Sequence, residues 1–405
     1  MQRPNFAASV FASATETLAL WLAQGWPPVA AAVGEWSEAH WSAAEWVAFW
    51  QGAIPGWAQR LDDAPAVLIA PERRARLQDV VAQSHARTER MLGEVQDMIR
   101  GLSAQGVELA PLKGARVAPF YYQPASLRPL GDVDVLIRPA DVTKARRWMD
   151  GHGYTFYSRS EEDVVYLRGT RRPEVWHPDN AHPVELHFRL REEFGGAGLH
   201  WDMSPSAWRE SALAPYLQTE TRLVSPPFLL RHLCAHMASD LFIRRGKIQQ
   251  MEDIARVARG FAPGDWDAFR SGVPARCARF VYPALALTGR TYGDVAPLEL
   301  MREMRAQVSP QLRAWVDAST LASASESNPE SRSGIGVELA RLLAETRWET
   351  ARALTASLLP PRWNLMKRYP RLAASPLYPL CYVLLNLDRV WHVSQKLARG
   401  RSRAL

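Results

Sequence analysis

The sequence of 405 residues predicts an α+β protein, in which a small mixed β-sheet is flanked by helical N-terminal and C-terminal regions. Apolar residues recur at helical spacing up to residue 102 and again after residue 201, and short alternating segments lie between them. We expect five parts along the chain. They are a tryptophan-rich helical region (1–75), an α/β core (76–200), a helical domain closing a cleft over the core (201–318), a flexible linker (319–336), and a helical segment with a basic tail (337–405).

Composition and charge limit the class of protein. An apolar content of 47% suits a soluble globular chain, and no stretch approaches the roughly twenty apolar residues that cross a bilayer. We expect a cytoplasmic protein, because a signal-peptide pattern is missing and the three cysteines are far apart. The net charge is +7, but residues 362–405 carry nine basic residues against one acid, which leaves −1 for residues 1–361. This near-neutral body argues against DNA binding and against a broad basic track for RNA.

The N-terminal part is predicted to be a set of helices. Residues 1–75 hold seven tryptophans, and spacings such as Trp46 to Trp50 indicate amphipathic helices that bury aromatic side chains. Core packing is the expected use of these rings, with a ligand cage as the alternative. A long charged helix is expected over 76–102, followed by a short apolar strand over 107–112.

A corner between that strand and the next helix contains Lys113 and Gly114. The helix is expected to continue to Tyr122, before the break at Gln123-Pro124. Free N–H groups at the start of a helix, together with the helix dipole, favour phosphate oxygens, and Lys113 adds a positive charge there. Alone this is a weak signal, and it gains value from the acidic residues that follow.

Two strand segments carry acidic side chains on one face. In Arg128-Pro-Leu-Gly-Asp-Val-Asp-Val-Leu-Ile137, alternation places Asp132 and Asp134 on one face and the valines toward a core. In Val184-Glu-Leu-His-Phe-Arg-Leu190, Glu185 and His187 share a face in the same way. If the strands are neighbours, three carboxylates converge, and their repulsion calls for cations. Oxygen ligands of this kind suit Mg²⁺ or Mn²⁺ together with substrate phosphates.

These motifs resemble a known family, the largely uncharacterised bacterial nucleotidyltransferases of the polymerase-beta-like superfamily. The resemblance covers roughly residues 80–262 and implies a short mixed sheet, with a helical second domain that closes the nucleotide cleft. Five motifs carry it in order: Leu112-Lys113-Gly114, Arg128 with Gly131-Asp-Val-Asp-Val-Leu136, Glu185-Leu-His-Phe188, Leu233-Cys-Ala-His236 and Asp253-Ile-Ala255.

The resemblance implies roles for individual residues. Asp132, Asp134 and Glu185 would hold the metal and carry the catalysis, and Lys113 with Gly114 would form the phosphate-binding corner. Better-known superfamily members have Gly-Ser at this corner and the aspartates about a dozen residues on, whereas here the gap is eighteen, so their triphosphate contacts do not carry over in detail.

The implied reaction is attack of an acceptor hydroxyl on the α-phosphorus of ATP or another nucleoside triphosphate, releasing pyrophosphate. Arg128 is a candidate clamp for triphosphate oxygens, because a guanidinium matches their geometry. His187 either orients the site or is a hydrogen-bonded strand histidine. Genes found beside those of family members suggest a small-molecule, glycan-related or peptide acceptor. Further candidates from the helical domain are His236, Asp240 and Asp253, the last with a structural role as its alternative.

Other interpretations stay open. Asp-Val-Asp also occurs at solvent-facing strand edges, and in glycosyltransferases that have a nucleotide-binding α/β half before the motif, where this chain is predicted to be helical. The sequence Pro129-Leu-Gly131 before the motif makes an Asp-x-Asp phosphatase a poor alternative. His232 and His236 are four residues apart, but no glutamate lies between them, so a packed helix face is favoured over a zinc pair.

Two functions compete with a nucleotidyltransferase acting on such an acceptor. One is a catalytically silent binding partner in a biosynthetic or membrane-associated complex, and the other is an RNA-modifying nucleotidyltransferase with strongly salt-dependent RNA affinity. The basic tail contains an apolar stretch over 377–385. A helix docked on the body is favoured there, with peripheral contact to an anionic inner membrane face as the alternative.

Overall fold

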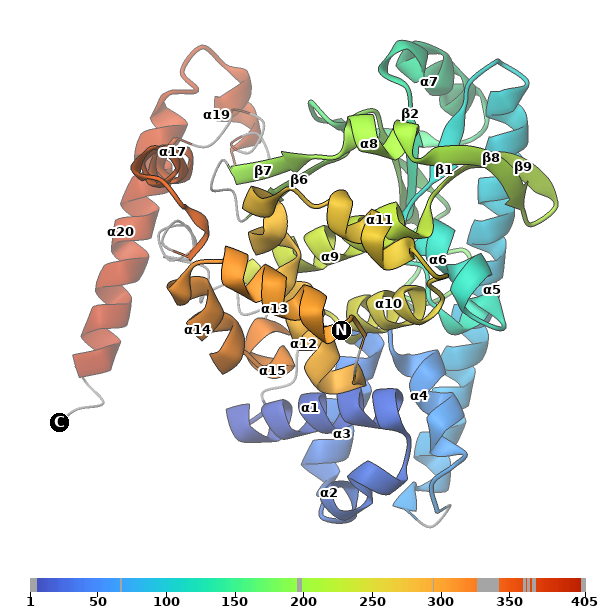
Figure 1. The fold of residues 1–405 in the computed structure, drawn as a ribbon, viewed down its shortest axis with the longest axis vertical. Helices are drawn as coiled ribbons and strands as arrows, with labels where there is room; N and C mark the ends of the chain where they lie inside the picture. Colours follow the sequence, from blue (N-terminus) through green and yellow to red (C-terminus); the bar gives the residue numbers. More distant parts are fainter. Residues whose placement is uncertain are drawn as a thin grey trace.

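The computed structural model describes residues 6–65, 68–194, 199–293, 295–325, 342–359, 362, 365 and 369–401. A small sheet lies beside a large helical body, and a C-terminal helical segment runs along the opposite edge of the molecule (Figure 1). The predicted α+β class, with a small mixed sheet and helical terminal regions, is confirmed.

The main sheet has five strands in the order β1-β2-β5-β4-β3. β2 and β5 are parallel, whereas the other three neighbouring pairs are antiparallel. The helices α6 and α7 follow β1 and β2 along the chain. The bounds are β1 (Leu109–Pro111), α6 (Lys113–Tyr121), β2 (Val133–Ile137), α7 (Val142–Gly151), β3 (Thr155–Arg159), β4 (Asp163–Arg168) and β5 (His182–His187).

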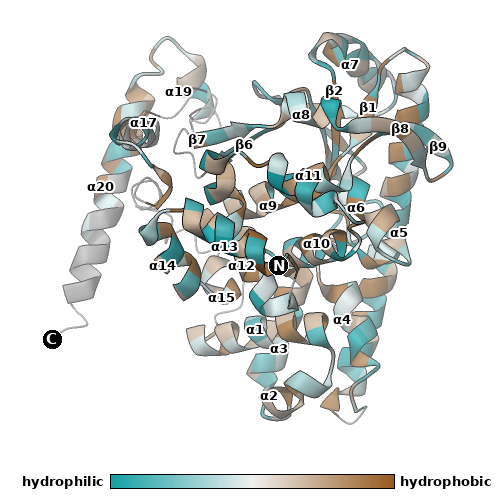
Figure 2. Cartoon of the chain, viewed as in Figure 1, coloured by the Kyte–Doolittle hydropathy of each residue, from teal (hydrophilic) through white to brown (hydrophobic). Residues whose placement is uncertain are grey.

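One face of the sheet packs against α5 (Pro71–Ser103), the long charged helix expected from the sequence. Val133, Val135 and Ile137 of β2 share a hydrophobic core with Val95 and other residues of the second half of α5. Polar and apolar residues alternate along this helix (Figure 2), because only one stripe of it is buried. The inward position of the valines is as predicted, and it leaves Asp134 on the opposite face.

The opposite face of the sheet meets the helical body. Leu136, which shares the face of Asp134, belongs to a second core built from helices of both halves of the chain. The acidic face of β2 is therefore directed toward the junction of sheet and helices. The helices of this body are α1 (Ala8–Gln24), α2 (Ala30–Gly34), α3 (Glu38–Trp50), α4 (Ile54–Leu61), α9 (Pro226–Phe242), α10 (Ile248–Arg259), α11 (Asp265–Ser271), α12 (Tyr282–Tyr292), α13 (Leu298–Gln307), α14 (Pro310–Ala318) and α15 (Leu321–Ser325).

Tryptophans of the N-terminal region cluster inside this second core. Trp21 and Trp57 are fully buried. Contacts between aromatic rings add to the stabilisation that burial alone provides. The rings pack in a core, as their spacing predicts. The Trp21 ring lies 5.2–6.5 Å, between centroids, from those of Trp26, Trp36, Trp41 and Trp57.

Residues 199–224 differ from the helical pattern expected after residue 201. β6 (Arg191–Phe194) pairs with β7 (Leu199–Asp202), and, after α8 (Ser204–Arg209), β8 (Ser211–Tyr216) pairs with β9 (Thr219–Val224). The β8–β9 hairpin is attached to β1 and α6, because Thr221 Oγ1 donates to the Leu109 carbonyl at 2.6 Å and Tyr216 OH donates to the Ala115 carbonyl at 2.7 Å. These contacts, distant in sequence, decide the conformation of this segment.

The C-terminal segment forms a small core of its own. Leu365, Ala373, Cys381 and Leu385 pack together, and α17 is tied to the helical body by the ion pair between Arg279 and Glu349 at 2.8 Å. In the described part of the chain, no helix combines the length and the apolar character needed to cross a membrane. The helices of this segment are α17 (Arg347–Leu358), α19 (Pro370–Ala374) and α20 (Leu380–Arg401).

The predicted division into five parts stays a prediction. The helices of the first and third parts share one core, so packing does not separate them. Of the predicted linker over 319–336, residues 319–325 include α15, whose Leu321 is buried, and the rest lies outside the described residues.

Replacing Trp21 by alanine is expected to lower the free energy of unfolding by about 3–5 kcal/mol, because it opens a cavity inside the tryptophan cluster. Urea unfolding followed by circular dichroism measures this change. Trp348→Ala is the matched control, because this tryptophan is 77% exposed and its loss should cost less than about 0.5 kcal/mol. Equal effects of the two substitutions would contradict the buried position of Trp21.

Candidate active site

The parallel pairing of β2 and β5 brings the two acidic segments together. Asp134 lies opposite Glu185 in the register, and Leu136 lies opposite His187. Because alternate residues of a strand share a face, Asp134, Glu185 and His187 project from the same side of the sheet. The structure makes β2 and β5 neighbours, which is the condition on which the expected convergence of acidic side chains depends.

Ligand atoms of Asp134, Glu185 and His187 all lie within 4.8 Å of one another. His187 Nε2 is 2.9 Å from Asp134 Oδ1 and 3.4 Å from Glu185 Oε2. Two carboxylates and one imidazole at this spacing fit a single divalent cation. The carboxylate oxygens suit Mg²⁺ or Mn²⁺, and an imidazole is also a common ligand of transition metals. We refer to these three residues as the acidic group.

Asp132 lies immediately before β2, and its side chain is exposed. It is not among the three residues whose ligand atoms cluster. The surrounding protein and the negative charge of Asp134 raise the pKa of Asp132, although Lys113 opposes this change. Asp132 therefore lies just before β2, where the charge of Asp134 acts on it, and outside the acidic group.

The corner after β1 holds Lys113 against the acidic group. The Leu112 N–H donates to the backbone carbonyl of Asp134 at 2.9 Å, which fixes the corner on β2. Lys113 has a φ of 39°, in the left-handed region that residues other than glycine rarely adopt. Its Nζ donates to Asp134 Oδ1 at 2.8 Å. Such strained residues cluster at functional sites, where the surrounding structure holds them in place.

Charge balance explains how these groups coexist. Burial opposes the charge of Lys113, but Asp134 and other carboxylates raise its pKa. Burial also opposes ionisation of Asp134, yet Lys113 and His187 hold the pKa of Asp134 well below its usual value. For His187, hydrogen bonds to Asp134 and Glu185 outweigh burial and raise its pKa to about 9. At neutral pH, an ammonium and an imidazolium therefore face the carboxylates.

Packing, rather than free N–H groups alone, accounts for Gly114. A Cβ at this position would overlap the Arg128 guanidinium and come within 2.7 Å of Leu130 Cδ2. Arg128 is itself buried, and its Nη2 donates to Asp253 Oδ2 at 2.7 Å, while Tyr122 OH donates to Asp253 Oδ1 at 2.9 Å. The ion pair of Arg128 with Asp253 thus connects α10 to the corner that holds Gly114. It gives Asp253 the structural role considered above, while the triphosphate clamp by Arg128 stays a prediction.

A second polar cluster lies between β6 and α9. Glu192 Oε1 is 3.2 Å from His232 Nε2 and 3.5 Å from His236 Nδ1, and His236 Nε2 is 3.8 Å from Asp240 Oδ2. Gln250 of α10 donates to Asp240 Oδ2 at 2.7 Å. His232 is buried, and the packed helix face favoured over a zinc pair stays a prediction.

Glu192 connects this cluster to Lys113. Burial opposes its ionisation, but His236 and His232 hold the pKa of Glu192 well below its usual value, and its charge helps to raise the pKa of Lys113. Sequence reasoning singled out His236 but missed Glu192. The available signal was weak, because Glu192 is one of two adjacent acids in a four-residue strand.

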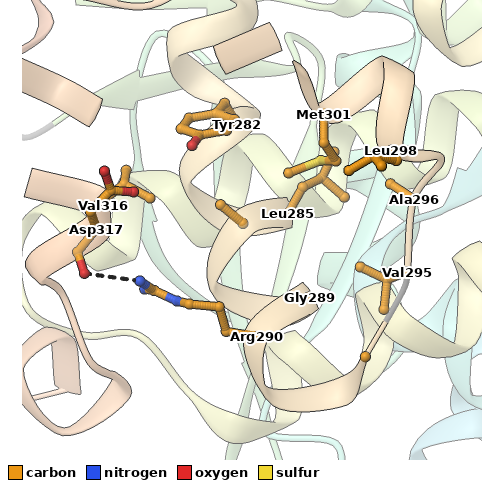
Figure 3. A pocket seen from close by; sticks show the side chains of 12 residues that line it. Tyr282, Leu285, Gly289, Arg290, Val295, Ala296, Leu298, Met301, Val316 and Asp317 are labelled. Atoms are coloured by element: carbon orange, nitrogen blue, oxygen red, sulfur yellow. Dashed lines mark hydrogen bonds between the residues drawn. The ribbon is translucent and has the colours of Figure 1, made fainter. Parts of the chain in front are cut away.

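A separate cavity of about 290 Å³ lies in the helical body, lined by residues of α12, α13 and α14 and of the segment between α12 and α13 (Figure 3). Its lining is mostly apolar, and at its edge Arg290 Nη1 donates to the Asp317 carbonyl at 3.1 Å. Neither the acidic group nor Lys113 lines this cavity.

A sequence model of the family described as "uncharacterised nucleotidyltransferase" matches residues 37–293, more than half of the chain. The chain belongs to this nucleotidyltransferase family. The match extends beyond the motif-bearing residues 80–262 into the N-terminal helices and through α12, so both parts that flank the sheet contribute to the family's pattern. All of the predicted site residues of this protein lie within the matched range 37–293.

Among solved structures, this family member is similar to an antigenic nucleotidyltransferase-like protein from Paracoccidioides brasiliensis. The two are 15% identical, with 60% of this chain and 99% of that chain covered and a TM-score of 0.34. A comparison with curated proteins gave no match.

Replacing Asp253 by leucine is expected to lower the free energy of unfolding by about 3–5 kcal/mol, because Arg128 is left buried without its partner. Arg128→Met combined with Asp253→Leu should cost less than the single Asp253→Leu change. Urea unfolding of the double-mutant cycle measures the coupling. A double variant less stable than the single one would contradict the buried pair.

Gly114→Ala is expected to lower the free energy of unfolding by about 1–3 kcal/mol, because the added methyl group overlaps Arg128. Gly131→Ala is the matched control, since a Cβ at Gly131 meets nothing within 4 Å. Thermal unfolding of both variants is the measurement. If Gly114→Ala is as stable as Gly131→Ala, close packing does not explain the glycine.

Proposed function

We propose that this protein is a metal-dependent nucleotidyltransferase that moves a nucleoside monophosphate from a nucleoside triphosphate to an acceptor hydroxyl, releasing pyrophosphate. The observation that carries the proposal is the register of β2 and β5, which sets Asp134 beside Glu185. Lys113 supports it, with Nζ 2.8 Å from Asp134 Oδ1. Membership of the nucleotidyltransferase family supports the reaction class, and we place the chain in the polymerase-beta-like superfamily as part of the same proposal.

The proposed metal ligands are Asp132, Asp134 and Glu185, to which we add His187 as a further donor that would lose its proton when the cation binds. The donor atoms within 4.8 Å of one another are the observation that fits Mg²⁺ or Mn²⁺. A divalent cation bound here would neutralise phosphate charge and lower the pKa of the attacking hydroxyl.

Residues of the chain itself would orient the triphosphate. The Lys113 ammonium has three donors and uses one on Asp134, so it can also donate to phosphate oxygens. Gly114 lets the corner lie close against Arg128, which is held by Asp253. The carboxylate of Glu192 stabilises the positive charge of Lys113, and we assign Glu192 a positioning role.

In the proposed reaction, the acceptor oxygen forms a bond to the α-phosphorus while the bond from that phosphorus to the bridging oxygen breaks. The electron pair of the broken bond leaves with pyrophosphate, and the hydroxyl proton passes to a carboxylate or to water. Glu185 is the proposed acceptor of this proton. Its side chain is 27% exposed, whereas Asp134 is 1% exposed and already bonded to Lys113 and His187.

The identities of the substrates are also proposals. ATP or another nucleoside triphosphate would be the donor, and a small-molecule, glycan-related or peptide hydroxyl in the cytoplasm would be the acceptor. The near-neutral charge of residues 1–361 supports an acceptor smaller than a nucleic acid.

A catalytically silent binding partner is the second candidate, and one observation favours it. Asp134 Oδ1 is bonded to both Lys113 Nζ and His187 Nε2, so the residues of the site balance the charge of this carboxylate by themselves. The two candidates differ in whether a nucleoside triphosphate is consumed.

Incubation of the protein with nucleoside triphosphates labelled at the α-phosphate, Mg²⁺ or Mn²⁺, and a cell extract is expected to yield a labelled product. Asp134→Asn and Glu185→Gln should each lower the rate by about a hundredfold or more, because each removes negative charge that holds the cation. Chelation by EDTA should abolish labelling, and added Mg²⁺ should restore it.

Glu220→Gln is the matched control, because Glu220 is exposed on β9 and should be dispensable for the reaction. Circular dichroism establishes that each variant is folded. A folded protein that neither labels a product nor binds any nucleoside triphosphate with either metal would favour the silent partner. Labelling that survives EDTA and both site variants would contradict the assigned site.

A further inference from the structure

The outer side of α20 is an exposed apolar stripe. Residues of this helix that recur every three or four positions lie on one side of it, and their side chains are 44–66% exposed. Large apolar side chains gathered in this way usually mark an interaction surface. The stripe consists of Leu380, Val383, Leu384, Leu387, Val390 and Trp391.

The helix uses a different side to attach to the protein. Cys381 and Leu385 are buried and pack with Leu365 and Ala373 in the small C-terminal core. α20 runs along the outer edge of the molecule, away from the sheet that carries the acidic group (Figure 1). One side of α20 therefore packs in the small C-terminal core, and the stripe on another side faces solvent.

Further exposed apolar residues lie in the same C-terminal segment. Leu358 and Leu359, at the end of α17, are each 54% exposed, and Asn386 of α20 donates to the Leu358 carbonyl at 3.1 Å. Leu377, just before α20, is 59% exposed. The contact between the two helices thus brings the exposed end of α17 against α20.

The same segment carries the excess positive charge of the chain. Residues 362–405 have a net charge of +8, whereas the remaining 361 residues sum to −1. Arg347, Arg352 and Arg371 are exposed, and four more basic residues follow along α20. An apolar stripe combined with basic residues is the pattern of helices that lie at an anionic lipid surface.

We propose that the segment from α17 to α20 binds the surface of an anionic lipid bilayer, with the stripe of α20 inserted among the headgroups and acyl chains. The surface position, rather than a spanning one, follows from the length and polarity of the described helices. A second copy of the chain is a poorer occupant, because pairing of two stripes would bring together two segments of +8 each. The inference is independent of the proposed nucleotidyl transfer.

The full-length protein is expected to co-sediment with vesicles of phosphatidylcholine and phosphatidylglycerol at low salt, and much less with vesicles of phosphatidylcholine alone. Leu387→Asp should weaken binding to the anionic vesicles by about tenfold or more, because it places a charge in the stripe. Leu213→Asp is the matched control, since Leu213 on β8 is 58% exposed and Leu387 is 60% exposed.

Replacement of Arg389, Lys396 and Arg399 by glutamine should weaken binding to anionic vesicles and leave the weak binding to neutral vesicles unchanged. Sedimentation velocity without lipid measures the oligomeric state, and so tests whether a second copy of the chain covers the stripe. Loss of vesicle binding in Leu387→Asp with no change in oligomeric state supports the proposal. It is overturned if the wild type does not bind anionic vesicles, if Leu213→Asp weakens binding as much as Leu387→Asp, or if Leu387→Asp converts a dimer to a monomer while lipid binding persists.

Discussion

The ammonium of Lys113 is the constraint on which the site depends. It lies 2.8 Å from Asp134 Oδ1, and its pKa is raised by carboxylates from three strands or strand ends: Asp134 and Asp132 at β2, Glu185 on β5 and Glu192 on β6. Without a cation at this point, mutual repulsion would oppose the arrangement of the strands. The left-handed backbone of Lys113 is the local cost of placing that charge.

The sequence predicts the strands that carry the site, and it singles out Asp134, Glu185 and His187, because the relevant patterns are local. Alternation over 128–137 fixes which side chains of β2 face the α5 core and which face the helical body. The same alternation puts Glu185 and His187 on one face of β5, whereas the pairing of β5 with β2 is known only from the structure. Pro226 is the first residue of α9, a position at which proline is favoured.

Other features depend on contacts between residues distant in sequence. The β8–β9 hairpin is held by bonds to the backbone of Leu109 and Ala115, and its own residues give only a weak strand pattern. Asp253 is turned inward because Arg128, 125 positions earlier, is buried against it. The ligand atoms of His187, rather than those of Asp132, complete the acidic group, since Asp132 precedes the first paired residue of β2. Periodicity contains none of this information.

The long helix α5 has a consequence for folding. Its residue Leu77 belongs to the core with the tryptophans, whereas Met91, Val95 and Met98 belong to the core beneath the sheet. A single helix therefore contributes to both hydrophobic cores. Neither core can unfold without exposing buried residues of α5. Unfolding of the core with the tryptophans should therefore destabilise the core beneath the sheet. We expect the chain to unfold cooperatively although it has two distinct hydrophobic cores.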